Sequence, residues 1–319
     1  MNLIIRIKNH LKFRCLYCIG CLKVRSISFE DYERLLSCRK YFFLATANML
    51  YGHHRIILKK YFNKKFSFIT FNRKILSRIL IDHGMCFGDT VREQELQNLN
   101  FTDYYTYGPK RKVIIERYLE DHLKKSVDVH AVGPYIKYVE NFYSDSQLAT
   151  LKQRYGRTLL VIPSHSVEGI NHFFDENLLL QEIERVAVNF DTVLVCVYWK
   201  DILEGKHETY LKKNYKVVCA GFNKDPYFLC RLRDLFTLCD LSMSNQLGTH
   251  IGYSICLDKP HYFFYQHQTY SGSVQKEQHF VGSNAQKNNE IALFSSLFGI
   301  CSETITDKQR RIINEYWGK

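Results

Sequence analysis

Histidines with small polar neighbours follow three of the apolar runs in this 319-residue chain. The first is His83-Gly84, which comes after Ile79–Asp82 and shortly before Asp89. A histidine can act as a general base because its pKa lies near neutrality, and a glycine permits close backbone approach. A structural histidine that caps a turn would give the same pattern. We expect His83 to be catalytic with Gly84 at the substrate, and Asp89 to be an alternative base.

The second group is Ser164-His165-Ser166, which follows the run Thr158–Ile162 and precedes Glu168. Backbone N–H groups at the start of a helix favour phosphate. Plain N-capping would explain one of the serines but not the whole cluster. We therefore expect both serines to bind phosphate and His165 to assist the leaving group. Glu168 is a further alternative base.

The third group forms the strongest signal in the chain, a small polar loop that opens a helix pattern after Asp240–Met243. A glycine at such a helix start lets backbone N–H groups cradle a phosphate. An ordinary capped helix between two strands is the alternative. The expected nucleotide contacts in this loop are Ser244, Asn245, Gly248, Thr249 and His250.

A fourth apolar run ends in Tyr198-Trp199-Lys200, where the aromatic pair could wall a base or sugar and Lys200 could meet phosphate. An aromatic pair there is equally typical of a core. For metals, no Asp-x-Asp follows a strand to hold Mg²⁺. The triplet Cys15-x-x-Cys18-x-x-Cys21 lacks the fourth ligand of a closed zinc site. The sequence therefore predicts no metal.

These groups must be positioned by strands and helices that alternate along the chain. The expected strands are 41–47, 66–71, 79–83, 103–108, 129–132, 158–162, 192–198, 216–220, 240–243 and 261–265. The expected helices between the later strands are 171–189, 226–239 and 248–257. Short apolar strands separated by single helices indicate parallel α/β sheets. The pattern restarts near residue 140, so we expect two Rossmann-like domains with the ligand cleft between them.

The predicted organisation has four parts. A basic amphipathic helix over 1–25 is followed by an acceptor-side domain over 26–140 and a nucleotide-donor domain over 141–302. A last helix, within 303–319, returns to the first domain. Composition agrees with a folded protein, since 46% of residues are hydrophobic and only five are proline. No apolar run approaches the length of a membrane span. An odd count of eleven cysteines, several in apolar runs, favours reduced thiols.

Positive charge is concentrated at the amino-terminal end. Residues 1–79 hold 17 basic and 3 acidic side chains, a balance of +14, whereas the rest hold 27 and 29, a balance of −2. Leu3, Ile4, Ile7 and Leu11 recur at helical spacing between basic residues. This pattern predicts a helix on an anionic membrane surface, although a helix packed on its own domain has the same periodicity. We find no nucleic-acid motif and expect no such partner.

Three segments resemble bacterial enzymes of capsule and surface-polysaccharide synthesis, which are glycosyltransferases of the two-Rossmann-domain GT-B type. Ser242–Tyr253 with Asp258-Lys259-Pro260 is similar to their donor element, with Asp258 in place of the usual glycine. Ile81-Asp82-His83-Gly84 resembles the "HG" element of the acceptor side. Pro163-Ser164-His165-Ser166 is similar to the "HP" motif of sialyl- and polysialyltransferases, without the proline after histidine. The resemblance covers about residues 40–317.

The resemblance implies transfer of a sugar from a nucleotide donor to a glycan or lipid-linked acceptor, inverting and independent of metal. It implies no cofactor besides the nucleotide sugar, which is a substrate. It also implies a cytoplasmic protein, peripheral to the inner face of the cell membrane. Three alternatives stay open: a teichoic-acid-type glycerophospho- or ribitolphosphotransferase, a sugar-nucleotide epimerase, and a non-catalytic, membrane-recruited module of capsule assembly.

Overall fold

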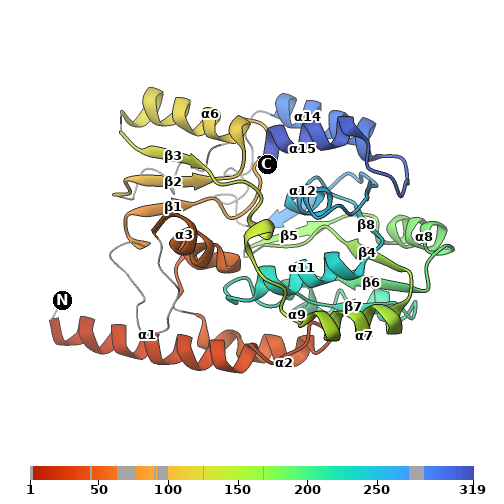
Figure 1. Ribbon diagram of the computed structural model, residues 1–319, viewed down its shortest axis with the longest axis horizontal. Coiled ribbons are helices and arrows are strands. Elements are labelled where there is room, and N and C mark those ends of the chain that lie inside the picture. The colour runs from red at the N-terminus through yellow and green to blue at the C-terminus, as the bar shows by residue number, and fades with distance from the viewer. Residues whose placement is uncertain are drawn as a thin grey trace.

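The protein is a mixed α/β structure with two parallel sheets (Figure 1). The structure is a computed structural model that describes residues 3–43, 45–62, 76–89, 91, 100–124, 126–167, 169–272 and 284–319. The first sheet has three strands, β1 (Ile79–Ile81), β2 (Asp103–Thr106) and β3 (Asp128–Ala131), paired in that order. These short runs form strands because their side chains, such as those of Leu80 and Tyr104, are buried in the core beside the sheet.

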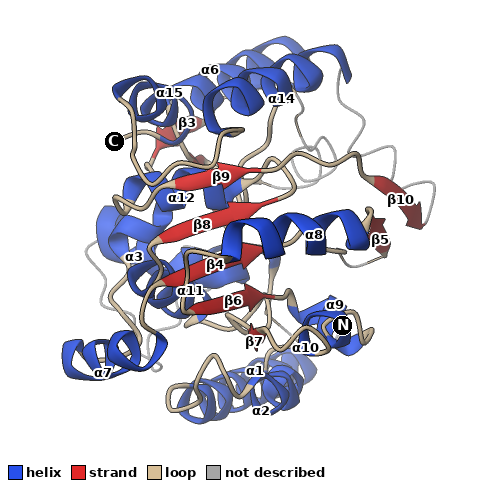
Figure 2. Ribbon diagram, turned by 90° about the vertical axis from the view of Figure 1, so that its right-hand side faces the viewer, coloured by secondary structure: helices blue, strands red, loops and turns tan. Residues whose placement is uncertain are grey.

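The second sheet has five parallel strands in the order β7-β6-β4-β8-β9, which Figure 2 shows from bottom to top. Their bounds are β4 (Thr158–Ile162), β6 (Thr192–Cys196), β7 (Lys216–Val218), β8 (Leu241–Ser244) and β9 (His261–Phe263). Along the chain, β4 is the first strand of this sheet. The next two strands, β6 and β7, are added on one side of β4, and then β8 and β9 are added on its other side. The strand order therefore reverses between β4 and β8, where Ile162 pairs with Ser244. Loops that leave these two strand ends diverge around a crevice in folds of this kind.

Helices cover both faces of the second sheet. Leu159 and Val161 of β4 point to one face and pack with α8 (Glu176–Ala187). Leu160 points to the other face and packs with α11 (Phe228–Leu238) and α12 (Thr249–Cys256). The remaining helices are α2 (Tyr32–Ser37), α3 (His53–Phe62), α6 (Pro109–Tyr118), α7 (Asp145–Tyr155), α9 (Trp199–Leu203), α10 (Glu208–Leu211), α14 (Asn284–Phe298) and α15 (Asp307–Trp317). Short helical turns are η1 (Cys38–Tyr41), η2 (Ala47–Gly52), η3 (Leu119–Leu123) and η4 (Tyr135–Tyr138).

The amino-terminal helix α1 (Leu3–Val24) lies outside both sheets, and Figure 1 shows its first half extending beyond them. Its second half packs through Tyr17, Cys21 and Val24, which share a buried cluster with Phe42 and Met49. Among the described residues, no helix combines the length and the hydropathy needed to cross a membrane.

The carboxyl-terminal helix α15 touches both halves of the chain. Trp317 lies against Gly252 of α12, so that a β-carbon at that glycine would overlap the indole ring. Tyr316 receives a hydrogen bond from Lys110 of α6, the helix that connects β2 to β3. The elements of the two sheets are therefore tied together at this end of the molecule.

Most expected strands are present, and two expectations are wrong. Segment 41–47 is not a strand, since Tyr41 ends η1 and Ala47 begins η2. Its apolar residues Phe42 and Ala45 are buried in the cluster that packs on α1, so they need no sheet to cover them. Segment 171–189 begins as a strand, β5 (Ile170–Phe173), which pairs antiparallel with β10 (Thr269–Gly272). Only its second part is helix α8. The strand expected over 66–71 lies outside the described residues.

All eleven cysteines are free. Ten of them are buried or half-buried, as the apolar runs around them led us to expect, while Cys15 is exposed on α1. Cys18 is half-buried and Cys21 is buried, so the triplet does not point to one place. In the part of the chain that the structure describes, no group of three or more histidine, cysteine or acidic side chains could hold a metal ion.

Candidate active site

The loops after β4 and β8 are joined by Asn245. Its Oδ1 accepts a hydrogen bond from the Ser164 N–H at 2.7 Å, and its Nδ2 donates to Gln266 Oε1 at 2.8 Å. Asn245 is fully buried, as is Ser244, whose hydroxyl lies 3.0 Å from His261 Nε2. The side chains of Ser244 and Asn245 therefore hold the loops together, and their expected role as nucleotide contacts stays a prediction.

Ser166 is also part of an internal network. Its N–H donates to Asp201 Oδ2 at 3.0 Å, and its hydroxyl accepts from Lys206 Nζ at 2.7 Å. Lys206 also pairs with Asp201 at 2.8 Å, and both Ser166 and Asp201 are buried. This network fixes the loop that carries His165. No sequence motif marks Asp201 or Lys206, and their partner lies about forty residues earlier in the chain.

Lys200 does not meet the expectation of a phosphate contact. Its ammonium donates to the carbonyl oxygens of Val167 and Ile170 at 3.0 and 3.3 Å, and to Asn171 Oδ1 at 2.5 Å. It also pairs with Glu204 at 3.2 Å. An ammonium has only three N–H bonds, so Lys200 is occupied in holding the turn before β5. Glu168 is outside the described residues.

His165 stands at the centre of the site. Its ring stacks on Tyr198, with 4.1 Å between ring centroids and 28° between planes. Its Nδ1 lies 3.1 Å from the Ser166 carbonyl oxygen. A carbonyl only accepts, so Nδ1 carries the proton and the neutral ring keeps a lone pair on Nε2. Burial lowers the pKa of His165, partly offset by the Ser166 carbonyl and by Asp201. The ring is therefore neutral at pH 7.

The start of α12 lies beside His165. Gly248 is the N-cap of the helix, and a β-carbon there would be 2.6 Å from Cε1 of His250. Burial and then the nearby His165 lower the pKa of His250 to about 3, and its Nε2 has no hydrogen-bond partner among the described residues. Thr249 Oγ1 accepts from the Met85 N–H at 2.8 Å. The predicted phosphate cradle therefore faces the loop that follows β1.

That loop brings His83 and Gly84 to the other side of the site. The preceding Asp82 is buried and accepts from Tyr104 and Thr106 hydroxyls at 2.7 and 2.6 Å and from Arg111 Nε at 3.4 Å. His83 is 6% exposed, and both of its ring nitrogens are closed to solvent. This burial is unfavourable for a base that must meet an acceptor. Gly84 would place a β-carbon 3.4 Å from Thr249 Oγ1, so it lies at the junction of the two halves.

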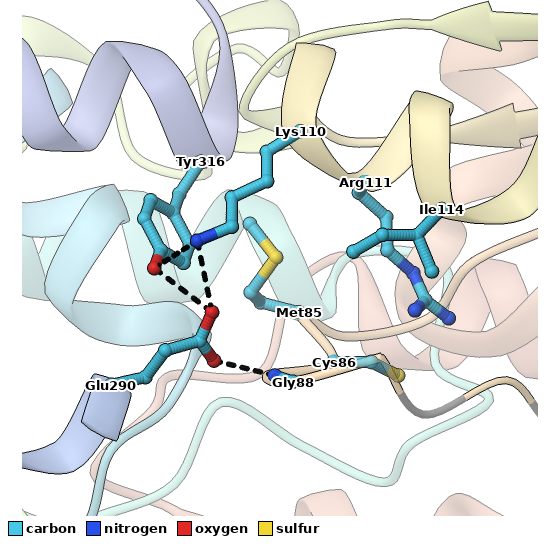
Figure 3. A pocket seen from close by; sticks show the side chains of 8 residues that line it. All are labelled: Met85, Cys86, Gly88, Lys110, Arg111, Ile114, Glu290 and Tyr316. Atoms are coloured by element: carbon cyan, nitrogen blue, oxygen red, sulfur yellow. Dashed lines mark hydrogen bonds and ion pairs between the residues drawn. The ribbon is translucent and has the colours of Figure 1, made fainter. Parts of the chain in front are cut away.

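The far end of the loop after β1, at Gly88, is held by Glu290 in the wall of a small pocket (Figure 3). Glu290 of α14 accepts from the Gly88 N–H at 2.5 Å and from the Tyr316 hydroxyl at 2.9 Å, and Lys110 lies 3.1 Å from the same carboxylate. The pocket is lined by Met85, Cys86, Gly88, Lys110, Arg111, Ile114, Glu290 and Tyr316. Its charged groups are paired with each other or with Asp82. Asp89, just beyond, is exposed.

A continuous row of rings connects the histidines of the two halves. His83 lies 6.3 Å from His53, and His53 lies 5.7 Å from Tyr51, between ring centroids. The Tyr51 hydroxyl is 3.3 Å from that of Tyr198, which in turn stacks on His165. Sequence reasoning missed His53 and Tyr51, because they belong to a helical turn and a helix start outside the strand pattern. The structure thus brings His83, Gly84, His165, Gly248, Thr249 and His250 to one region where both halves meet.

Comparisons with known proteins leave the family open. No family model and no curated protein matches the sequence. Among solved structures, a glycosyltransferase from Rickettsia africae is 13% identical, with a TM-score of 0.33 over 75% of this chain and 66% of that one. Anabaena Alr3699/HepE in complex with UDP-glucose is 13% identical, with a TM-score of 0.35 over 70% and 62%. Staphylococcus aureus MnaA with UDP is 12% identical, with a TM-score of 0.32 over 67% and 58%.

The chain thus spans about two thirds or less of the length of these structures. Likenesses at this identity and TM-score do not assign an activity to this chain.

Proposed function

We propose that the protein is a GT-B-type glycosyltransferase that moves a sugar from a nucleotide donor to a glycan or lipid-linked acceptor during surface-polysaccharide synthesis. The observation that supports it is the meeting of three loops: the one with His165 after β4, the one that starts α12 after β8, and the His83–Gly84 loop after β1. In this proposal residues 141–302 bind the donor, residues 26–140 bind the acceptor, and residues 303–319 return to the first domain.

The donor phosphate would lie at the start of α12. The N-terminus of a helix carries about half a positive charge and directs N–H groups outward. Gly248 leaves that end uncovered by any side chain of its own, and Thr249 holds it against the Met85 N–H. Backbone N–H groups and the helix dipole would then stabilise the leaving phosphate, so the proposed reaction proceeds without metal.

His165 and His83 are the two candidates for the general base. His165 is half-buried, neutral at pH 7, and has a lone pair on Nε2, which suits removal of a proton from an acceptor hydroxyl. His83 was the expectation from sequence, but its ring nitrogens are closed to solvent. We therefore favour His165 and keep His83 as the alternative, which requires the β1 loop to move. In either case the displacement would invert the anomeric centre.

The first experiment is a thermal-shift panel with UDP, GDP, CMP and CDP. A ligand that binds only the folded protein raises the melting temperature by mass action. Gly248→Val should weaken binding of the best nucleotide by about a hundredfold or more, because two charge-assisted contacts are worth about 3 to 6 kcal/mol in total. The φ of Gly248 is −159°, which valine tolerates, so the fold should survive once the His250 ring moves. If no nucleotide stabilises the protein, the transferase proposal fails.

Turnover then separates the candidate bases and the rival functions. His165→Ala should lower the rate about 10² to 10⁴-fold while leaving nucleotide affinity within a few-fold. His83→Ala with the same loss, and normal turnover by His165→Ala, would return the role to His83. Release of CMP from CDP-glycerol or CDP-ribitol would favour the teichoic-acid-type reaction. Conversion of a UDP-sugar to its epimer would indicate an epimerase, and nucleotide binding without turnover would favour the non-catalytic module.

We also propose that the protein sits at the inner face of the cell membrane through α1. The outward side of its second half carries Ile19 and Leu22, which are 42% and 54% exposed, beside the exposed Lys12 and Lys23. Phe43, which follows η1, is 55% exposed, and η1 packs against α1. Apolar side chains among basic ones suit an anionic lipid surface.

A further inference from the structure

Two pairs of tyrosine hydroxyls join the two halves of the chain, and they differ in exposure. Tyr107 and Tyr253 are 3.1 Å apart and almost fully buried, at 0% and 3% exposed. Tyr51 and Tyr198 are 3.3 Å apart and only half-buried. The first pair is therefore part of the interior, whereas part of each residue in the second pair is accessible to solvent.

The backbone holds Tyr51 in an unusual conformation. Its φ of 55° lies in the left-handed region, which is uncommon for a bulky residue. The Tyr51 N–H donates to the Asn223 carbonyl oxygen at 2.6 Å. The next residue, Gly52, has a φ of 76°, and a β-carbon there would lie 2.7 Å from the Pro226 carbonyl oxygen. Backbone strain of this kind is concentrated at functional sites, and here it directs the Tyr51 hydroxyl at Tyr198.

Further polar groups surround the Tyr198 hydroxyl. Burial and then the neighbouring Tyr51 hydroxyl raise the pKa of Tyr198, and the adjacent side chains of Trp199 and Asn223 lower it in part. Trp199 Nε1 and Asn223 Oδ1 are themselves buried and have no hydrogen bond of normal geometry with any described residue. One N–H donor and one carbonyl acceptor with unmet capacity thus flank two hydroxyls that can each donate and accept. This combination is suited to the hydroxyl groups of a sugar.

We propose that Tyr51 and Tyr198 bind a hydroxyl group of a carbohydrate substrate next to His165, an inference that rests on the proposed function. The sugar hydroxyl would accept from one phenol and donate to the other. The Tyr51 ring packs on Phe228, with 4.8 Å between the ring centroids, and this contact helps to hold the Tyr51 hydroxyl beside Tyr198. The same chemistry fits the transferred sugar and the acceptor sugar, so the test must tell the two apart.

The test uses Tyr51→Phe, which removes one hydroxyl, with Tyr107→Phe as the matched control from the buried pair. Affinities for UDP and UDP-glucose are measured by calorimetry. Binding of D-glucose, D-galactose and N-acetylglucosamine is measured by saturation-transfer NMR. Loss of one hydrogen bond should weaken the sugar-dependent binding about 3- to 10-fold. A transferred sugar at the site predicts weaker UDP-glucose binding with unchanged UDP binding, and an acceptor sugar predicts weaker binding of a free sugar. Tyr107→Phe should change neither affinity.

The outcomes separate this inference from the proposed function. If the wild type binds no nucleotide of the panel but binds a free sugar more tightly than Tyr51→Phe does, the transferase proposal fails and the sugar site stands. The sugar site is overturned if Tyr51→Phe weakens UDP and UDP-glucose equally. It is also overturned if wild type and Tyr51→Phe agree in every measurement, or if the wild type binds no sugar probe. Tyr198→Phe, which keeps the stack on His165, must reproduce the Tyr51→Phe result.

Discussion

Acidification from pH 8 to pH 5.5 should destabilise the protein through its buried neutral histidines. Burial is the largest cause that lowers the pKa of His54 and His250 to about 3 and that of His172 to about 4. The pKa of an unfolded histidine is about 6.5. Below that value the histidines bind protons in the unfolded chain but stay neutral in the folded protein, so the free energy of unfolding falls as the pH falls. The loss should begin near pH 6.5 and continue toward pH 4.

The size of the effect follows from linkage. At pH 5.5 an unfolded histidine is about 90% protonated, which costs the folded state about 1.4 kcal/mol for each histidine that stays neutral. Three histidines give about 4 kcal/mol. Asp234 opposes them, because burial raises its pKa to about 7 and its protonation then stabilises the fold by about 2 kcal/mol in this range. A net loss of about 2 kcal/mol or more remains, since the pKa values of His53 and His261 are also lowered by burial.

Urea unfolding at pH 8 and pH 5.5 measures this loss directly. His54→Gln is the matched variant, because His54 is fully buried, lies outside the candidate site, and has Tyr17 as a hydroxyl neighbour at 3.5 Å that glutamine can also meet. The variant should lose about 1.4 kcal/mol less than the wild type between the two pH values. Carboxylates other than Asp234 contribute little above pH 5. An unfolding free energy that is equal at both pH values, or larger at pH 5.5, would refute the reasoning.

Three further predictions concern the loops and the termini. Lys206→Met leaves the buried Asp201 without its ion pair, so the melting temperature should fall by about 2 to 6 °C, while the exposed Lys212→Met should leave it unchanged. Ile19→Ser combined with Leu22→Ser should reduce sedimentation with phosphatidylserine vesicles at low salt without changing urea stability; unchanged sedimentation would rule out this face of α1. Tyr316→Phe removes a hydrogen bond to Glu290 and should lower the unfolding free energy by about 1 kcal/mol, and a loss of nothing measurable would contradict that contact.

Lipid contact by α1 is tested by point substitutions because part of this helix belongs to the buried core. Deleting residues 1–25 would remove Tyr17, Cys21 and Val24 from a buried cluster, and Arg231 would lose the Val24 carbonyl oxygen to which it donates at 2.5 Å. Such a deletion would confuse loss of lipid contact with loss of the fold. The exposed side chains on the opposite face of the helix can be changed alone.

Local sequence patterns predicted the strands of both sheets well, because a buried parallel strand is a short apolar run with few other interpretations. Strand β5 was missed for a complementary reason. Ile170–Phe173 has the mixed polarity of a helix start, and its partner β10 lies about a hundred residues later in the chain. The strand predicted over 41–47 was wrong because apolar residues are also buried beside short helical turns such as η1 and η2. In both cases the deciding interaction was with a distant element that periodicity does not reveal.

The candidate site shows the same division between local and distant effects. Position after a strand end predicted which loops would meet, since strand order brings the ends of β4 and β8 together. It did not predict what each polar side chain would do there. Loops that cross at a switch point need their own hydrogen bonds, and Asn245, Ser166 and Lys200 supply them.

A polar residue at such a place is therefore a ligand contact only when the protein leaves part of its bonding capacity unused. His165 keeps the lone pair on Nε2, and no side chain caps the start of α12 by a hydrogen bond. The half-buried residues Tyr51 and Tyr198 lie at the same junction, with 3.3 Å between their hydroxyl oxygens. In the proposed function these groups act as a base, an anion site and a pair of hydroxyl-binding phenols, which is the set that transfer of a sugar from a nucleotide would use. The residues that hold them, Asn245 and Lys206 above all, should then affect activity only through the positions of these groups.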